Sequence, residues 1–243
     1  MQAERAGEPP SVAVEAPAVP EEVVGAAEAA PTPQPGRFAT LSDATLAYSF
    51  QYPVALASGR ELTWVTTREP TRYASAAPLS ADARQRIVCE LANFKGPLTV
   101  SVTVGPPPPV LDLVGAPESW TPRQLAAALL ADRSTGRVTS GQRISLASLE
   151  AVTSAVVDGG QYISFETVAQ GSPTFVDPTA QTFRHAIGVT AGRDGYYYTL
   201  VLTAPERLWA EVQPLFTASV QSFRLTKPTE SYRAPDTSSL QFW

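Results

Sequence analysis

His185 is the only histidine in the 243-residue chain, so its imidazole is the starting point for any chemistry. A single imidazole excludes every metal centre or catalytic arrangement that needs two of them. A carboxylate, Glu206, is expected beside it on the same face of the protein. An imidazole and a carboxylate that lie close together can share a divalent ion such as calcium, manganese or zinc. The alternative is an ordinary surface histidine beside a glutamate that caps a helix, because two ligands alone make a weak metal site.

The proximity of these two residues follows from a hairpin turn predicted at Asp194-Gly195. Asp-Gly strongly favours a two-residue turn, because both central residues need positive φ, which glycine adopts freely and aspartate tolerates. With that turn in place, counting back along the two strands puts His185 opposite Ala204. Glu206 is then the diagonal neighbour of His185, with about 7–8 Å between their Cα atoms.

Two strands and a helix must hold this pair in place. Apolar and small residues alternate from His185 to Ala191 and again in Tyr196 to Leu202, which is the period of a half-buried strand. Thr203 to Glu206 has the pattern of a capping box, so a helix is expected to begin there. Its apolar stripe repeats at spacings of three and four residues: Leu208, Val212, Leu215, Phe216, Ser219, Val220 and Phe223. Pro214 predicts a kink or a restart within that helix.

Strand pairs are also predicted upstream. Residues 45–56 alternate in polarity, and Ser58-Gly59 is expected to turn the chain into a partner strand over residues 61–67. Residues 68–86 are polar and irregular. Residues 86–94 and 98–104 then predict a second pair of strands around a turn at 95–97. The prolines at 106–109 end that pair, because proline has no N–H for the ladder.

A helix and a third hairpin complete the pattern. Thr121 as N-cap, Pro122 at the first helical position and Gln124 at the third predict a helix, which Gly136 is expected to end. Residues 144–157 and 161–170 are predicted to pair through a turn at 158–160. Antiparallel strands with helices packed on them indicate the α+β class, with helices on the faces of an antiparallel sheet.

Composition excludes several classes of function. The net charge is −5, and no cluster of lysine and arginine is long enough to follow a phosphate backbone, so nucleic acid is not an expected partner. Cys89 is the single cysteine, which excludes an intramolecular disulfide; its strand pattern predicts a small buried residue. No apolar run approaches the roughly 18 residues of a membrane span, so any membrane association is expected to be peripheral.

The 23 prolines divide the chain. Residues 1–40, rich in alanine, proline and glutamate, are expected to form a disordered arm, because they hold too few large apolar residues to offset ordering entropy. Residues 41–226 are expected to form one domain, followed by an extended tail over 227–243. That tail ends in Phe242 and Trp243, which are expected either to fold back on their own domain or to anchor a partner.

Several stretches together resemble the PsbP family of thylakoid-lumen proteins. The final stretch, "RHAIGVTAGRDGYYYTLVLTAPERLWAEVQPLFTASVQSFRL", is similar to the end of that family. "LAYSFQYPV" resembles its opening strand, and "LTVSVTV" with "LDLVGAPESWTPRQLAAALL" resembles its strand and helix start. The resemblance covers residues 41–226 and implies a PsbP-like α-β-α sandwich. In that family a histidine and an acidic residue at matching positions have been proposed as a metal site, and here they fall on His185 and Glu206.

The resemblance implies a non-catalytic extrinsic subunit or assembly factor of a photosynthetic membrane complex, most readily the oxygen-evolving complex of photosystem II. The partner would then be a photosystem or related thylakoid complex at its lumenal face, and the location the chloroplast thylakoid lumen. Six glutamates in the first 36 residues are unlike an Arg-rich transit peptide, so this location depends on the resemblance. Two alternatives stay open. One is a soluble protein-binding module of the same fold outside the lumen, and the other is a metal-assisted hydrolase.

Overall fold

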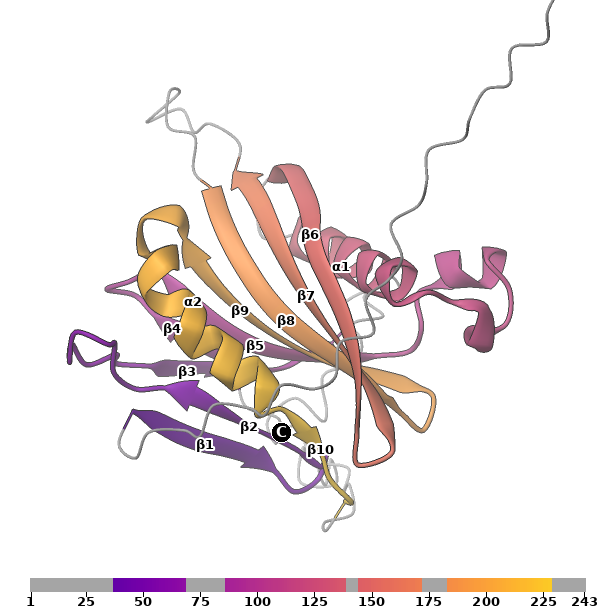
Figure 1. Ribbon diagram of the computed structural model, residues 1–243, viewed down its shortest axis with the longest axis horizontal. Coiled ribbons are helices and arrows are strands. Elements are labelled where there is room, and N and C mark those ends of the chain that lie inside the picture. Colours follow the sequence, from indigo (N-terminus) through magenta and orange to yellow (C-terminus); the bar gives the residue numbers. More distant parts are fainter. Residues whose placement is uncertain (1–36, 69–85, 139–143, 172–182, 229–243) are drawn as a thin grey trace, which may run out of the picture.

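A strongly curved antiparallel sheet forms the framework of the protein (Figure 1). The computed structural model describes residues 37–68, 86–138, 144–171 and 183–228. Within these residues, seven strands pair in the order β3-β4-β5-β9-β8-β7-β6. Their bounds are Val65–Arg68 (β3), Arg86–Asn93 (β4), Leu98–Gly105 (β5), Ile144–Val157 (β6), Gly160–Gly171 (β7), Phe183–Arg193 (β8) and Tyr196–Pro205 (β9).

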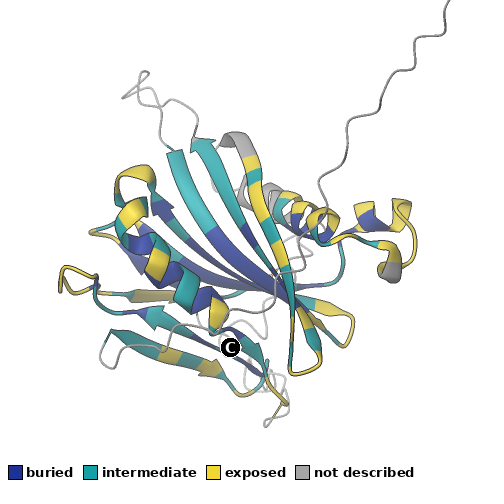
Figure 2. Cartoon of the chain, in the orientation of Figure 1, coloured by how far each residue is buried: buried dark blue, intermediate teal, exposed yellow. Residues whose placement is uncertain are grey.

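A smaller sheet and a helix cover one face of the large sheet. The small sheet has the order β1-β2-β10, with bounds Phe38–Asp43, Tyr48–Pro53 and Arg224–Leu225. The helix is α2, Glu206–Gln221. Its predicted stripe is confirmed, because Val212, Leu215, Phe216 and Val220 are buried against the sheet, and Phe223 just beyond the helix is buried too. Burying each large side chain contributes on the order of 2–3 kcal/mol. Figure 2 shows the buried residues concentrated on the strands that this helix covers.

The other face carries α1, Pro122–Val138. Leu125 and Leu129 pack there against Phe165 and Val201 in a second, smaller core. The predicted capping box is confirmed, because the Thr121 N–H donates to Gln124 Oε1 at 2.9 Å and the Gln124 N–H donates to Thr121 Oγ1 at 3.2 Å. Two short 3₁₀ turns, η2 (Pro109–Leu113) and η3 (Pro117–Ser119), lead into this helix. The α+β class with helices on both faces of an antiparallel sheet is therefore confirmed.

The two predicted hairpins with Asp-Gly turns are also confirmed. Asp158-Gly159 joins β6 to β7, and Asp194-Gly195 joins β8 to β9. All four of these turn residues have positive φ, between 51° and 78°. This is the geometry of the type I′ turn that Asp-Gly favours. The β4–β5 pair is confirmed as well.

The first predicted hairpin is wrong. β2 does not pair with the strand beyond Ser58-Gly59; it pairs with β1 on one side and with β10 on the other. β3 instead pairs with β4 in the large sheet, and one isolated bridge, Ala55 to Glu61, remains at the predicted turn. The arm expected through residue 40 is also too long, because β1 begins at Phe38. Phe38 and Leu41 pack on the main core, and this burial stabilises the extra strand.

The start of α2 differs from the prediction as well. Thr203 does not cap the helix, because β9 continues to Pro205, which is the N-cap and makes no side-chain capping bond. The Thr203 hydroxyl instead contacts Thr99 Oγ1 at 2.5 Å across the β5–β9 ladder. The helix does not restart at Pro214, and α1 continues beyond Gly136 to Val138. The rest of the arm, the irregular segment at 69–85, the loop at 172–182 and the tail from residue 229 lie outside the described residues.

Candidate functional site

His185 and Glu206 meet where β8 begins beside the first turn of α2. The predicted register is confirmed, since His185 pairs with Ala204 and Arg193 with Tyr196. The side chains come into direct contact, with His185 Nε2 bonded to Glu206 Oε2. The His185 side chain is 17% exposed and that of Glu206 is 65% exposed. The pair is therefore open to solvent on the carboxylate side and held by the protein on the imidazole side.

Trp209 fixes the plane of the imidazole. It lies three residues after Glu206, about one helical turn. Its ring stacks on His185 with centroids 4.8 Å apart and planes 15° apart. Trp209 is itself held edge-on by Phe216, which is fully buried. The imidazole can therefore rotate little, and its Nε2 edge stays directed at the carboxylate. The sequence placed Trp209 in the helix but gave no signal of this stack.

The imidazole nitrogen and the carboxylate oxygen are atoms of the kinds that coordinate divalent ions. Imidazole nitrogen beside one carboxylate suits zinc or manganese, whereas calcium prefers an all-oxygen shell. Within the part of the chain that the structure describes, no group of three or more histidine, cysteine, aspartate or glutamate side chains could hold a metal ion. An ion at this place would therefore take its remaining ligands from outside the described residues, for example from water or from a partner. The imidazole must be neutral to bind it, so protons and metal compete for His185.

Arg184 ties this site to the neighbouring β4–β5 turn. Its guanidinium donates to the Pro97 carbonyl at 2.8 Å and to Thr203 Oγ1 at 3.0 Å. The turn, the start of β8 and the end of β9 are thereby joined beside His185. Sequence patterns did not identify this role, because the bond links residues 87 positions apart.

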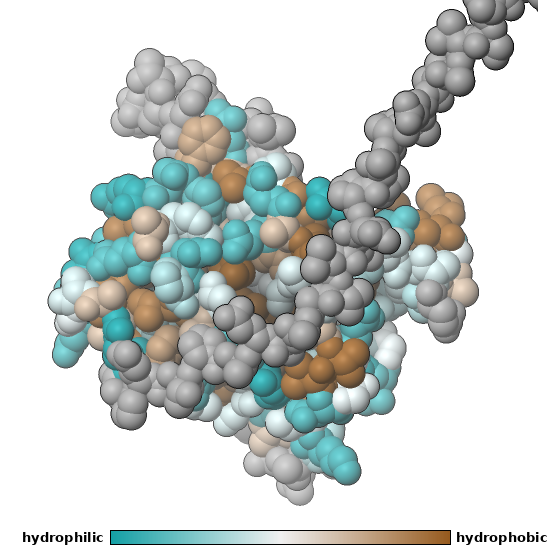
Figure 3. Space-filling view, viewed as in Figure 1, coloured by the Kyte–Doolittle hydropathy of each residue, from teal (hydrophilic) through white to brown (hydrophobic). Residues whose placement is uncertain are grey.

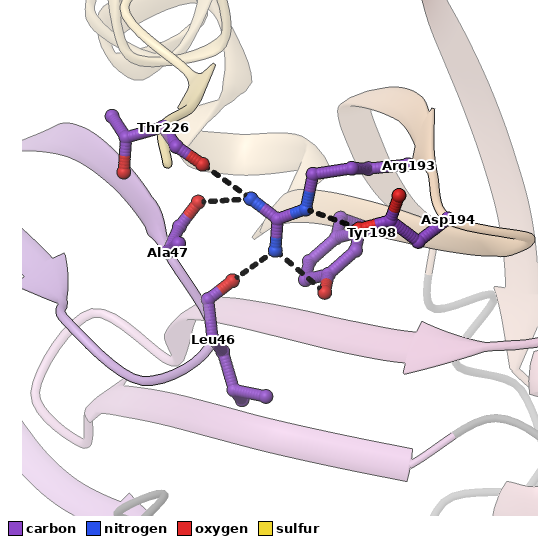
Figure 4. Close-up of polar contacts among 6 residues, drawn as sticks. All are labelled: Leu46, Ala47, Arg193, Asp194, Tyr198 and Thr226. Carbon is purple, nitrogen blue, oxygen red and sulfur yellow. Dashed lines mark hydrogen bonds and ion pairs between the residues drawn. The ribbon is translucent and has the colours of Figure 1, made fainter. Parts of the chain in front are cut away.

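Arg193 makes a second polar cluster at the opposite end of β8 (Figure 4). It donates to the carbonyls of Leu46, Ala47 and Thr226 at 2.7, 2.9 and 2.5 Å, and to the Tyr198 hydroxyl at 2.8 Å. The guanidinium carbon also lies 4.7 Å from the centroid of the Tyr198 ring. The carbonyls belong to the β1–β2 turn and to the end of β10, so Arg193 joins the two sheets. It is a structural residue that the sequence did not reveal.

The remaining candidate residues are structural too. Cys89 is buried, as predicted. Alternation along β9 places Tyr198 in the main core and Tyr197 against the α1 side, while Tyr196 is exposed, so the three tyrosines form no continuous stacking surface. Burial raises the pKa of Tyr197 above its ordinary value. Phe242 and Trp243 lie outside the described residues.

The fold agrees with a family comparison. The family model described as PsbP matches residues 36–225, which is most of the chain. The protein therefore belongs to the PsbP family, and the resemblance seen in the sequence is confirmed. The match begins at residue 36, which agrees with the strand that the structure shows from Phe38.

Individual proteins also resemble the chain. PsbP domain-containing protein 5, chloroplastic, of Arabidopsis thaliana is 37% identical over 208 residues, which cover 85% of this chain and 70% of that protein. The solution structure of cyanobacterial PsbP (CyanoP) from Synechocystis sp. PCC 6803 superposes with a TM-score of 0.51. It is 16% identical and covers 83% of this chain and 98% of its own, so it supports the fold alone. None of the helices that the structure describes is long and apolar enough to cross a membrane.

Proposed function

We propose that this protein is a non-catalytic auxiliary or extrinsic subunit of a photosynthetic membrane complex, with photosystem II and its oxygen-evolving complex as the first partner to test. The observation that carries the proposal is the PsbP family match over residues 36–225. It is supported by the relative of 37% identity, whose name describes it as chloroplastic. The protein would act in the chloroplast thylakoid lumen, bound peripherally to the lumenal face of the complex. Nucleic acid is not part of the proposal.

The site favours a role in binding over a role in catalysis. Hydrolytic sites bring together a nucleophile or activated water, a base and groups that stabilise developing charge. His185 and Glu206 supply one contact between an imidazole and a carboxylate, and Trp209 adds an apolar ring. This arrangement can hold a divalent ion at a surface. In the proposed function such an ion, zinc or manganese before calcium, would join the protein to its partner through shared ligands.

Fractionation of chloroplasts tests the proposed location. The full-length precursor, tagged at its C-terminus, would be expressed in plants and followed through stroma, thylakoid membrane and lumen fractions. We expect the protein in the lumen and on thylakoids, in a form that high salt removes, because charged surface contacts are screened. A protein found only in the stroma or cytosol would contradict the proposal and favour the alternative of a soluble binding module.

Capture from solubilised thylakoids tests the partner. Crosslinking before solubilisation should recover subunits of photosystem II or of a neighbouring complex with the wild type. A variant lacking residues 240–243 tests whether Phe242 and Trp243 anchor that partner. Lost capture with unchanged thermal unfolding supports an anchor, whereas a melting temperature lowered by several degrees with capture intact supports docking of the tail on its own domain. If neither changes, both roles of the tail are wrong.

A further inference from the structure

A cleft of about 260 Å³ opens beside the first turns of α2. Its walls are the turn over residues 56–62, the β4–β5 turn and the start of the helix, which meet at one side of the molecule (Figure 1). Its apolar floor is formed by Leu56, Leu62, Leu98, Leu208 and Val212. Most of these floor residues also belong to the main core, so the cleft exposes the edge of that core.

Positive charge dominates the rim of this cleft. Arg60, Lys95 and Arg207 line it, against one carboxylate, Glu61. Arg60 already forms an ion pair with Glu211 at 3.3 Å. Lys95 and Arg207 are exposed and, among the described residues, form no hydrogen bond or ion pair. Two cations around one cleft that have no partner among the described residues favour an anionic ligand, although the whole chain carries a net charge of −5.

Hydrogen bonds hold the walls in place before any ligand binds. The buried Asn93 side chain accepts from the Gly96 N–H at 2.7 Å and donates to the Thr63 carbonyl at 2.9 Å. On the other side, Ser58 donates to Glu211 at 2.8 Å and fixes the 56–62 turn to α2. A preformed cleft loses little conformational freedom on binding, which favours affinity.

An exposed aromatic ring stands next to the cationic rim. Phe94 lies in the β4–β5 turn beside Lys95 and is 72% exposed. An isolated exposed ring needs no explanation, but Phe94 directly precedes Lys95, which lines the apolar cleft. Figure 3 shows mostly hydrophilic residues over the outer side of α2, so apolar contact here is local. The complementary chemistry is a short segment with carboxylates next to apolar side chains.

We propose that this cleft binds a short acidic peptide segment of a partner protein, with its carboxylates at Lys95 and Arg207 and an apolar side chain against Phe94 and Leu208. The inference rests on the proposed function only in that the segment would belong to the partner complex. Peptide binding is measured with purified components, and location and capture are measured in chloroplasts. A failure of one proposal is therefore distinguishable from a failure of the other.

The test is fluorescence anisotropy with the full chain and a labelled synthetic peptide of about ten residues, in which two glutamates lie between aliphatic residues. A second peptide carries glutamines in their place. We expect the glutamate peptide to bind at least fivefold more tightly than the glutamine peptide, with a difference that shrinks as salt rises. Lys95→Glu and Arg207→Glu should each weaken binding of the glutamate peptide at least fivefold. Phe94→Ser should weaken binding of both peptides.

Matched charge reversals away from the cleft serve as controls. The controls are Lys227→Glu and Arg86→Glu. Lys227 lies beyond β10, and Arg86 lies at the opposite end of β4 from the cleft. Both should bind like the wild type. Equal weakening by these controls, or equal binding of the two peptides, would overturn the proposal. Concentration-dependent self-association in sedimentation that Lys95→Glu and Arg207→Glu abolish would assign the cleft to a second copy and would also overturn it.

Discussion

The imidazole of His185 lies flat against the indole of Trp209, with ring centroids 4.8 Å apart, while its Nε2 edge contacts Glu206. One ring of the helix therefore orients a side chain of the strand, and the carboxylate one turn earlier completes the pair. The pair therefore joins an imidazole nitrogen of nearly fixed orientation to an exposed carboxylate, and both atoms can coordinate a metal ion.

Zinc binding should depend on both His185 and Glu206. We expect His185→Ala and Glu206→Gln each to weaken zinc binding at least tenfold by titration calorimetry, because each removes one of two protein ligands. Binding should also weaken as pH falls, since a protonated imidazole cannot coordinate the metal. Trp209→Leu keeps both donors and should weaken binding by only about two- to threefold, through the loss of orientation. Glu61→Gln is the control, and equal affinities for wild type and His185→Ala would remove His185 from the site.

Arg193 should be among the most important polar residues for stability. Arg193→Met removes the donors to three carbonyls and to the Tyr198 hydroxyl, although the Ala47 carbonyl keeps its bond from the Thr226 N–H. We expect the free energy of unfolding to fall by about 2–4 kcal/mol in denaturant titrations. Arg193→Lys should recover only part of this, because an ammonium lacks the planar fork of donors. Arg86→Met at an exposed position is the control and should change stability by less than about 0.5 kcal/mol.

Gly188 should tolerate no side chain. A Cβ there would lie 2.6 Å from Phe165 Cζ and 2.8 Å from the Leu200 carbonyl oxygen. Gly188→Ala should therefore lower the free energy of unfolding by about 3 kcal/mol. Adding Phe165→Leu should recover part of the loss, because it removes the ring but not the carbonyl. At Gly160 an added Cβ would meet its nearest atoms at 3.5 Å, and Gly160→Ala should be nearly neutral. Equal melting temperatures for the two alanine variants would show that the backbone at Gly188 adjusts.

Alkaline pH should unfold the protein through Tyr48. Burial raises the pKa of Tyr48 far above its ordinary value, and nearby Cys89 and Asp43 raise it further. The unfolded chain releases this proton near pH 10, while the folded chain keeps it. Stability is therefore fully present below about pH 10 and falls above it, by up to about 1.4 kcal/mol per pH unit for this group. Tyr48→Phe should flatten this slope in denaturant titrations, and Tyr196→Phe at an exposed position should not.

The sequence by itself determined the elements whose signals are local. Asp-Gly at 158–159 and at 194–195 specifies a turn through its backbone preferences, and a turn of known length sets the register of its two strands. This is why the contact between His185 and Glu206 could be predicted by counting. Thr121 and Gln124 specify their helix start in the same local way.

Tertiary structure decided what depends on residues far apart in the chain. Thr203 and Glu206 match the sequence pattern of a helix capping box. The pairing of Thr203 with Thr99 and the length of β9 nevertheless keep Thr203 in the sheet. β2 takes β1 and β10 as neighbours because the burial of Tyr48 and Phe50 against α2 outweighs a nearby Ser-Gly turn. The stack on Trp209, the bonds of Arg193 and the cleft beside Lys95 likewise join segments that no short pattern connects. Burial and cross-sheet hydrogen bonds act through space, so only the assembled fold could fix them.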